Sequence, residues 1–215
     1  MGLRFFGARS VMLGIGTLAA AVAAMAGAAA PAHAALGLAC PYPTSPVFLR
    51  WGDHHNYALT PGGDFESGAA GWTLTGGARV VTGNESFNVG GPGQTHSLSL
   101  PVGSSATSPP MCIGAFSGGM RLFTSNTGRA SSRLRVQVIY AGGAGALLGW
   151  LGTTLGIADA GTLTSTGAWT AADNIPMLGG MAPLLTSGVQ FRITPLDTTG
   201  NWRVDDVYLD PLMHR

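Results

Sequence analysis

Two segments of the chain alternate apolar and polar residues with a period of two. In 132–140 the apolar positions run from Leu134 to Tyr140, and in 189–194 they begin at Val189. Successive side chains of a strand point to opposite faces, so each segment is predicted to be a strand with one buried face. Further short strand-like segments, bounded by Gly, Pro, Ser or Asn, lie at 79–82, 96–100, 120–124 and 202–209. This spacing predicts an antiparallel β-sandwich, and no segment shows comparable helical periodicity.

The rest of the chain is harder to assign to elements. Residues 142–185 are rich in Gly, Leu and Thr, and prolines interrupt any long element there. We expect long loops and short strands in this segment, with one helical turn at 157–159. Residues 35–60 contain several prolines and are predicted to form an irregular N-terminal arm that lies on the domain. The sandwich domain is therefore assigned to 61–212.

The first segment, 1–34, has the pattern of a secretory signal peptide. Arg4 and Arg9 give a positively charged start, and 11–30 form an uncharged apolar run. An A-x-A motif at 32–34 then supplies a cleavage site. A permanent membrane anchor is the alternative, because the run is nearly long enough to span, but it is rich in Ala and only mildly hydrophobic. We expect cleavage, secretion to the extracellular side and no stable membrane span afterwards.

Composition narrows the class of protein further. Of the 215 residues, 34 are Gly and 13 are Pro, which disfavours long helices. Hydrophobic residues make up 46% and charged residues 10%, a balance that suits a buried core rather than a disordered chain. All 11 basic residues are Arg, they form no cluster, and the formal net charge is +1. Nucleic acid is therefore not an expected partner.

The two cysteines, Cys40 and Cys112, both lie beyond the signal peptide. An even number of cysteines in an exported chain favours a disulfide, which here joins the arm to the body of the domain. The alternative is that Cys40 is a lipid-modified N-terminus, which leaves Cys112 without a partner.

The most specific motifs lie at the two ends of the sandwich segment. The chain reads G-G-D-F-E-S-G at 62–68 with G-W at 71–72, and W-R-V-D-D-V-Y-L at 202–209. Here it resembles the jelly-roll carbohydrate-binding modules of families four, nine and twenty-two, which open with N-G-D-F-E…G-W and close with W-x-V/I-D-D-V-x-L. The chain is also similar to secreted proteins of unassigned function from high-GC Gram-positive bacteria. The resemblance implies a jelly roll that binds carbohydrate without catalysis.

The two adjacent aspartates of the closing motif interrupt the alternation of that strand. Trp202 and Val204 share one parity, whereas Val207 and Leu209 have the other. A bulge between the two pairs returns both of them to the core. The bulge also brings a carboxylate close to the interior of the sandwich.

A carboxylate in that position needs hydrogen-bond donors or a cation. The oxygens of Asp64, Glu66, Asp205 and Asp206 are candidates for an all-oxygen calcium site. The resemblance implies a structural Ca²⁺ held by the Glu of the opening motif, an Asp of the closing motif and backbone carbonyls. The alternative is that Asp205 pairs with Arg203 or a loop amide and that no metal binds.

A sugar site needs aromatic faces that stack on the ring and polar groups that reach its hydroxyls. The candidates are tryptophans of the loop-rich segment and polar residues of predicted strands: Trp150, Trp169, Arg135, Gln137 and Arg192. Loops commonly carry binding residues, which favours the two tryptophans. The alternatives are that the tryptophans are core residues and that the strand arginines only keep a sheet face soluble.

Catalytic arrangements are scarce in this sequence. Hydrolysis of glycans uses two carboxylates in a cleft, and the ten acidic residues lie mostly in turns or in the proposed calcium set. No G-x-S-x-G motif is present. The expected function is a secreted, non-catalytic module that binds polysaccharide or cell-envelope glycan. The alternatives are a structural or protein-interaction protein of the cell envelope and a small secreted glycan hydrolase.

Overall fold

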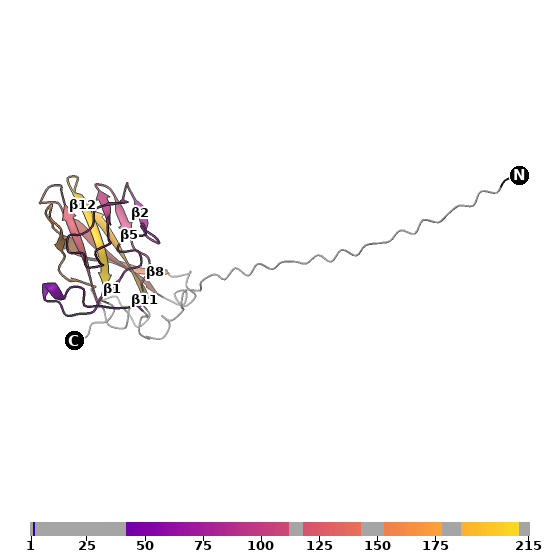
Figure 1. Cartoon of the computed structure of the whole chain (residues 1–215), viewed down its shortest axis with the longest axis horizontal. Coiled ribbons are helices and arrows are strands. Elements are labelled where there is room, and N and C mark those ends of the chain that lie inside the picture. The colour runs from indigo at the N-terminus through magenta and orange to yellow at the C-terminus, as the bar shows by residue number, and fades with distance from the viewer. Residues whose placement is uncertain (1, 3–41, 112–117, 143–152, 178–185, 211–215) are drawn as a thin grey trace. The chain divides into compact units, whose positions relative to one another are not determined.

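The structure is a computed structural model, and it describes Gly2 and residues 42–111, 118–142, 153–177 and 186–210. Contacts divide the chain into two units, Met1–Ala30 and Pro31–Arg215. Strands arranged in two sheets dominate the second unit (Figure 1). Within the described residues, no helix is long and apolar enough to cross a membrane.

The first sheet has seven strands, and all of its pairings are antiparallel. Its main path runs β10-β6-β12-β4-β3, while β1 pairs with β12 and β9 pairs with β6. The bounds are β1 Ala58–Leu59, β3 Arg79–Thr82, β4 His96–Pro101, β6 Gly119–Asn126, β9 Thr170–Ala171, β10 Ile175–Pro176 and β12 Asn201–Leu209.

The second sheet has five strands in the order β2-β5-β11-β7-β8 and is also antiparallel throughout. The bounds are β2 Thr73–Thr75, β5 Ser105–Thr107, β7 Leu134–Gly142, β8 Thr153–Leu163 and β11 Thr186–Pro195. The two sheets confirm the predicted all-β antiparallel sandwich. The helical turn predicted at 157–159 is wrong, because those residues pair with β7 as part of β8.

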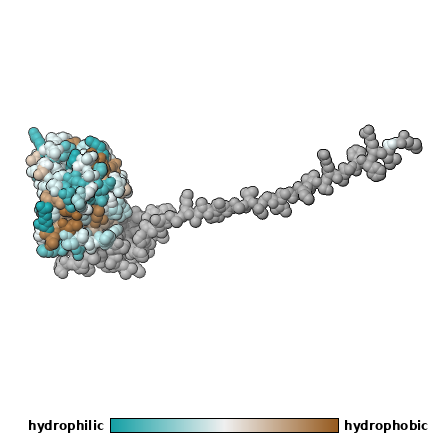
Figure 2. Space-filling model, viewed as in Figure 1, coloured by the Kyte–Doolittle hydropathy of each residue, from teal (hydrophilic) through white to brown (hydrophobic). Residues whose placement is uncertain are grey.

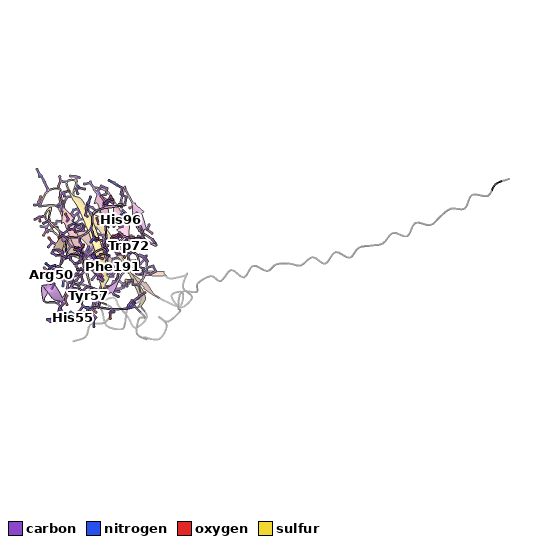
Figure 3. The ribbon with its side chains drawn as sticks, in the orientation of Figure 1. Arg50, His55, Tyr57, Trp72, His96 and Phe191 are labelled. Atoms are coloured by element: carbon purple, nitrogen blue, oxygen red, sulfur yellow. The ribbon has the colours of Figure 1, made fainter. Side chains whose placement is uncertain are left out.

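One hydrophobic core fills the space between the sheets, and the alternation of the strands supplies it. Val136 and Val138 of β7 and Phe191 of β11 are buried in this core, opposite Leu98 and Val204 of the other sheet. Figure 3 labels Phe191 within it. Because alternate side chains point away, the outer face of the five-stranded sheet keeps its polar residues at the surface.

Strand β6 is buried on both faces, because residues 42–60 cover the outer side of the seven-stranded sheet. This segment contains the short 3₁₀ helix η2, Leu49–Trp51, and places Phe48 against Phe123 of β6 and Tyr208 of β12. Arg121 of β6 is buried beneath it, with its guanidinium 4.2 Å from the centre of the Phe48 ring. An ion pair of 2.9 Å joins Arg121 to Asp53.

The bulge predicted in the closing strand is present. Asp205 pairs with Phe123 while Tyr208 pairs with Arg121, so β12 has one more residue than β6 between these pairs. Asp206, inside the bulge, has a positive φ of 48°, the left-handed conformation. Val204 and Val207 both lie in the core as a result.

Candidate functional site

A row of polar side chains crosses the outer face of the five-stranded sheet. The register aligns one residue of each strand, in the order Thr73, Thr107, Arg192, Gln137 and Asp159. All five are at least partly exposed, whereas their neighbours Ala106, Ile193 and Val136 are buried. Neighbouring strands lie about 4.8 Å apart, so the row spans roughly 19 Å.

An ion pair holds one end of this face. Arg135 donates from its guanidinium to both carboxylate oxygens of Asp159, at 2.5 and 2.7 Å. These hydrogen bonds hold the pKa of Asp159 below its ordinary value and raise that of Arg135. The Asp159 side chain is 57% exposed, so the pair adds little stability. Its effect on the site is to fix both side chains and to cancel their charges.

Arg192 occupies the middle of the row without such a partner. It lies on β11, the central strand, between Thr107 of β5 and Gln137 of β7. Its Nε donates to Thr107 Oγ1 over a long 3.4 Å. All ten acidic residues lie within the described segments, and none of the ion pairs found there includes Arg192.

Two further rows of aligned residues flank the central row and add other chemical groups to the face. On one side, Thr194 pairs with Arg135, and the hydroxyls of Thr75 and Ser105 lie 2.8 Å apart. On the other side, Ile139 is aligned with Ile157, which is 49% exposed. The face therefore combines hydroxyl, amide and guanidinium groups with an apolar edge.

The structure brings together three of the five predicted sugar-binding residues. Arg135, Gln137 and Arg192 share the outer face just described. Trp169 precedes β9 on the other sheet, where it is partly buried against the cluster that contains Phe123. Trp150 lies outside the described residues. Trp169 is therefore not on the face that carries Arg135, Gln137 and Arg192.

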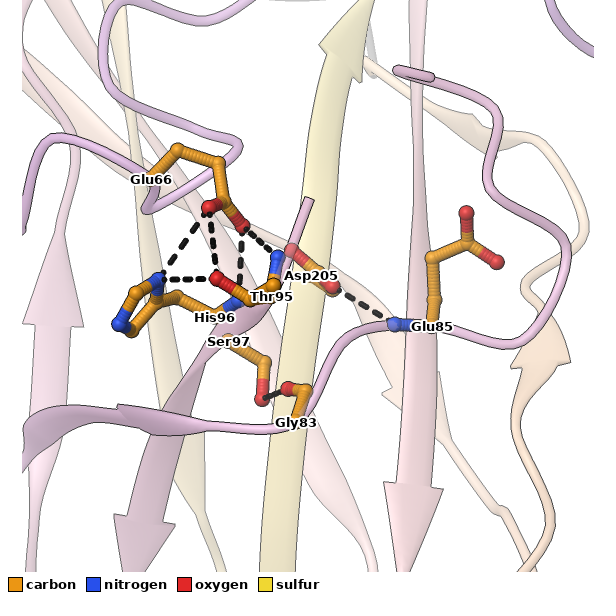
Figure 4. Close-up of polar contacts among 7 residues, drawn as sticks. All are labelled: Glu66, Gly83, Glu85, Thr95, His96, Ser97 and Asp205. Carbon is orange, nitrogen blue, oxygen red and sulfur yellow. Dashed lines mark hydrogen bonds and ion pairs between the residues drawn. The ribbon is translucent and has the colours of Figure 1, made fainter. Parts of the chain in front are cut away.

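The predicted calcium residues have separate roles in the structure, and Figure 4 shows two of them, Glu66 and Asp205. Glu66 accepts hydrogen bonds from the backbone N–H groups of Thr95, at 2.8 Å, and His96, at 2.7 Å. Its carboxylate also lies 3.2 Å from His96 Nδ1. Burial alone raises the pKa of Glu66, but the hydrogen bonds from His96 and Thr95 outweigh it and hold the pKa below its ordinary value. Glu66 thus anchors the start of β4.

Asp205 is satisfied by the backbone, which is the loop-amide alternative of the sequence analysis. Its two oxygens accept hydrogen bonds of 2.9 Å from the N–H groups of Glu85 and Asp206. Arg203 instead donates to the carbonyl of Thr82. Burial, followed by the charge of Asp206, raises the pKa of Asp205 to about 9.

Asp206 is the unsatisfied member of the group. It is 0% exposed, and both of its carboxylate oxygens are enclosed without a hydrogen-bond partner. Burial, followed by the charge of Glu85, raises its pKa to about 7. Asp64 and Glu66 add negative charge nearby. Gln94 lies beside Asp206 and lowers its pKa, but the Gln94 Oε1 atom is also enclosed without a partner.

Glu85 is a buried acid that the sequence analysis missed. Its carboxylate accepts hydrogen bonds from the N–H groups of Phe87 and Val89, so it closes the loop after β3. The sequence around it, N-E-S at 84–86, has no periodic pattern that predicts this role. The structure does not bring Asp64, Glu66, Asp205 and Asp206 into one cluster of metal ligands, and the described residues contain no group of three or more His, Cys, Asp or Glu arranged to hold a metal.

Comparison with known proteins assigns no family to the chain. No family model matches the chain, and no curated protein sequence matches it. Among solved structures, it is similar to TmCBM61 in complex with β-1,4-galactotriose, at 17% identity and a TM-score of 0.47, over 70% of this chain and 96% of that chain.

Two other solved structures are similar at the same level. One is the Clostridium thermocellum N-terminal xylanase 10B fragment in complex with xylohexaose, at 18% identity and a TM-score of 0.47. The match covers 70% of this chain and 27% of that chain. The other is a family 16 carbohydrate-binding module, at 18% identity and a TM-score of 0.42, over 70% of this chain and 98% of that chain. All three matches are below 20% identity.

Proposed function

We propose that the protein is a secreted, non-catalytic module that binds glycan on the outer face of its five-stranded sheet. The observation that carries this proposal is the meeting of Arg135, Gln137 and Arg192 on one face, in register with threonine hydroxyls. Sugar hydroxyls both donate and accept hydrogen bonds. Amides and hydroxyls do the same, and a guanidinium adds donors in a fixed geometry.

The acids of the face support binding rather than hydrolysis. Glycoside hydrolysis uses a pair of carboxylates across the scissile bond. Asp159 is the one acidic residue on the five strands, and it is bonded to Arg135. The adjacent acids Asp205 and Asp206 are fully buried in the other sheet.

A glycan array with the mature protein, residues 35–215, tests the proposal. The β-linked oligosaccharides found with the structural neighbours, galactotriose and xylohexaose, are natural first probes. Gln137→Ala should weaken binding about tenfold, since one or two hydrogen bonds are worth about 1.4 kcal/mol, with little change in melting temperature. Asn56→Ala, an exposed amide of the arm, is the matched control. An empty array, or equal binding by both variants, contradicts the proposal.

A second candidate function is contact with another protein of the cell envelope through the arm. Leu49 is 50% exposed, and the rings of Trp51 and Phe87, which lie 5.0 Å apart, are partly exposed. The guanidinium of Arg50 lies 5.7 and 5.2 Å from the centres of these two rings. Figure 3 labels Arg50 on the arm, and Figure 2 shows hydrophobic and hydrophilic residues interspersed on the face in view.

Binding to cell envelopes treated with glycosidase or with protease distinguishes the two candidate functions. If glycan is the partner, glycosidase treatment of the envelopes abolishes their retention of the protein and protease treatment does not. The opposite pattern, together with loss of retention in Leu49→Asp, favours contact with a protein.

Secretion and the Cys40–Cys112 disulfide are part of the same proposal. Both cysteines and nearly all of the signal segment lie outside the described residues, so these remain predictions from the sequence. A structural Ca²⁺ is a further proposal. The enclosed oxygens of Asp206 and Gln94 support it, because hard cations prefer oxygen ligands and an unpaired buried carboxylate is costly.

A further inference from the structure

We infer that the glycan carries anionic groups, carboxylate or sulfate, and that Arg192 is the residue that recognises them. The inference rests on the proposed glycan-binding function of the same face and specifies the class of ligand. It is carried by the position of Arg192 and by the way the acidic residues of the chain are distributed.

Arg192 lies at the centre of the face. It is on the middle strand of five, with two strands on each side. Thr107 and Gln137 are its direct neighbours in the row, so a glycan lying across the strands contacts all three. The side chain is partly exposed, which leaves its donors within reach of a ligand.

Within the part of the chain that the structure describes, no acidic side chain forms an ion pair with this guanidinium. Asp159 is two strands away, about 10 Å along the row, and both of its oxygens bind Arg135. With two arginines and one aspartate on its five strands, the face has a net charge of +1. Because the ion pair cancels the charge of Arg135, the excess positive charge is centred on Arg192.

The unused donors of Arg192 suit an oxyanion. Its single hydrogen bond within the described residues, to Thr107, uses Nε and is long. A guanidinium has five N–H donors in a planar fork, which matches two oxygens of a carboxylate or sulfate. Neutral hydroxyls of the same glycan are served by Gln137 and Thr107. The face therefore separates one charged subsite from its neutral hydrogen-bonding groups.

Matched ligands test this inference by calorimetry. Oligogalacturonate and its methyl ester share one backbone and differ in charge, and chondroitin and chondroitin sulfate separate recognition of carboxylate from that of sulfate. We expect at least a tenfold preference for the charged member of one pair. Raising NaCl from 50 to 500 mM should weaken binding of the charged ligand only, since salt screens partly exposed charges.

Variants of Arg192 complete the test. Arg192→Gln should bring the affinity for the charged ligand close to that for its neutral counterpart, so that the ratio of the two affinities falls to about one. Arg192→Lys keeps the positive charge but lacks the planar set of guanidinium donors, so it should retain part of the preference for the charged ligand. This variant also provides the test if Arg192→Gln does not fold. Arg79→Gln, on an exposed position of β3 in the other sheet, is the matched control and should change nothing.

Two results would contradict the inference without contradicting the proposed function. One is equal affinity of the wild-type protein for both members of each pair. The other is a preference that survives in folded Arg192→Gln. By contrast, absence of binding to any glycan, neutral or charged, overturns the proposed function itself.

Discussion

Replacing Asp206 with Asn should remove part of the pH dependence of stability in the metal-free protein. The wild-type carboxyl is fully enclosed, lacks a hydrogen-bond partner and lies near Glu85. Its pKa is raised from 3.8 to about 7 on folding. An amide of nearly the same shape fills the space and does not ionise.

The sign and size of the effect follow from this shift. Below about pH 4 both folded and unfolded states hold the proton, so ionisation makes no contribution. As pH rises from about 4 to 7, the Asp206 carboxyl keeps its proton only in the folded state. The free energy of unfolding therefore falls over this range. The shift of about 3 pKa units corresponds to a loss on the order of 4 kcal/mol, which is complete above pH 7. Asp205, whose pKa is raised to about 9, adds its own loss of stability over the same range and extends the decline toward pH 9.

Urea denaturation in EDTA between pH 5 and pH 9 measures this profile. Wild-type stability should fall steadily with pH, and Asp206→Asn should show a clearly smaller fall. Asp173→Asn, at an exposed position, is the control and should follow the wild type. A flat wild-type profile from pH 5 to pH 8 would refute the reasoning. Under the calcium proposal, millimolar Ca²⁺ should raise the wild-type melting temperature more at pH 8 than at pH 5, because the cation competes with protons.

Three further predictions concern stability. The secreted protein should contain no free thiol by titration in denaturant, and Cys112→Ala should cost about 2 to 5 kcal/mol of stability; two reactive thiols would disprove the pairing. Trp169→Ala should cost about 2 kcal/mol by urea denaturation, because its ring packs against buried aromatics, and should leave glycan affinity unchanged. Arg121→Met should cost about 3 kcal/mol at pH 7 by leaving Asp53 without its ion pair, and an unchanged urea midpoint would show that the pair adds nothing.

Strand periodicity predicted the elements that have one buried face. The alternation at β7 and β11 follows the sandwich core residue by residue, and the parity change in β12 located its bulge. Strand β8 was missed because Thr153–Leu163 has small residues on both faces, so its pairing with β7 decides the conformation. Periodicity does not predict the burial of Phe123, whose outward side chain is covered by the arm and by Phe87.

Strand periodicity also predicted part of the candidate site. Alternation placed Arg135 and Gln137 on the outer side of their strand, but the row with Arg192 depends on register between strands far apart in sequence. The role of Glu85 depends on a loop that folds back onto its own carboxylate, and local sequence patterns do not encode such a contact.

Mapping of backbone amide shifts by NMR, with the oligosaccharide that the array selects, tests the location of the site most directly. The account predicts that the largest shifts fall on 105–107, 134–138 and 190–194, the strand segments that form the outer face of the five-stranded sheet. Shifts concentrated in the arm at 45–57, or an absence of shifts with every glycan tried, would contradict it.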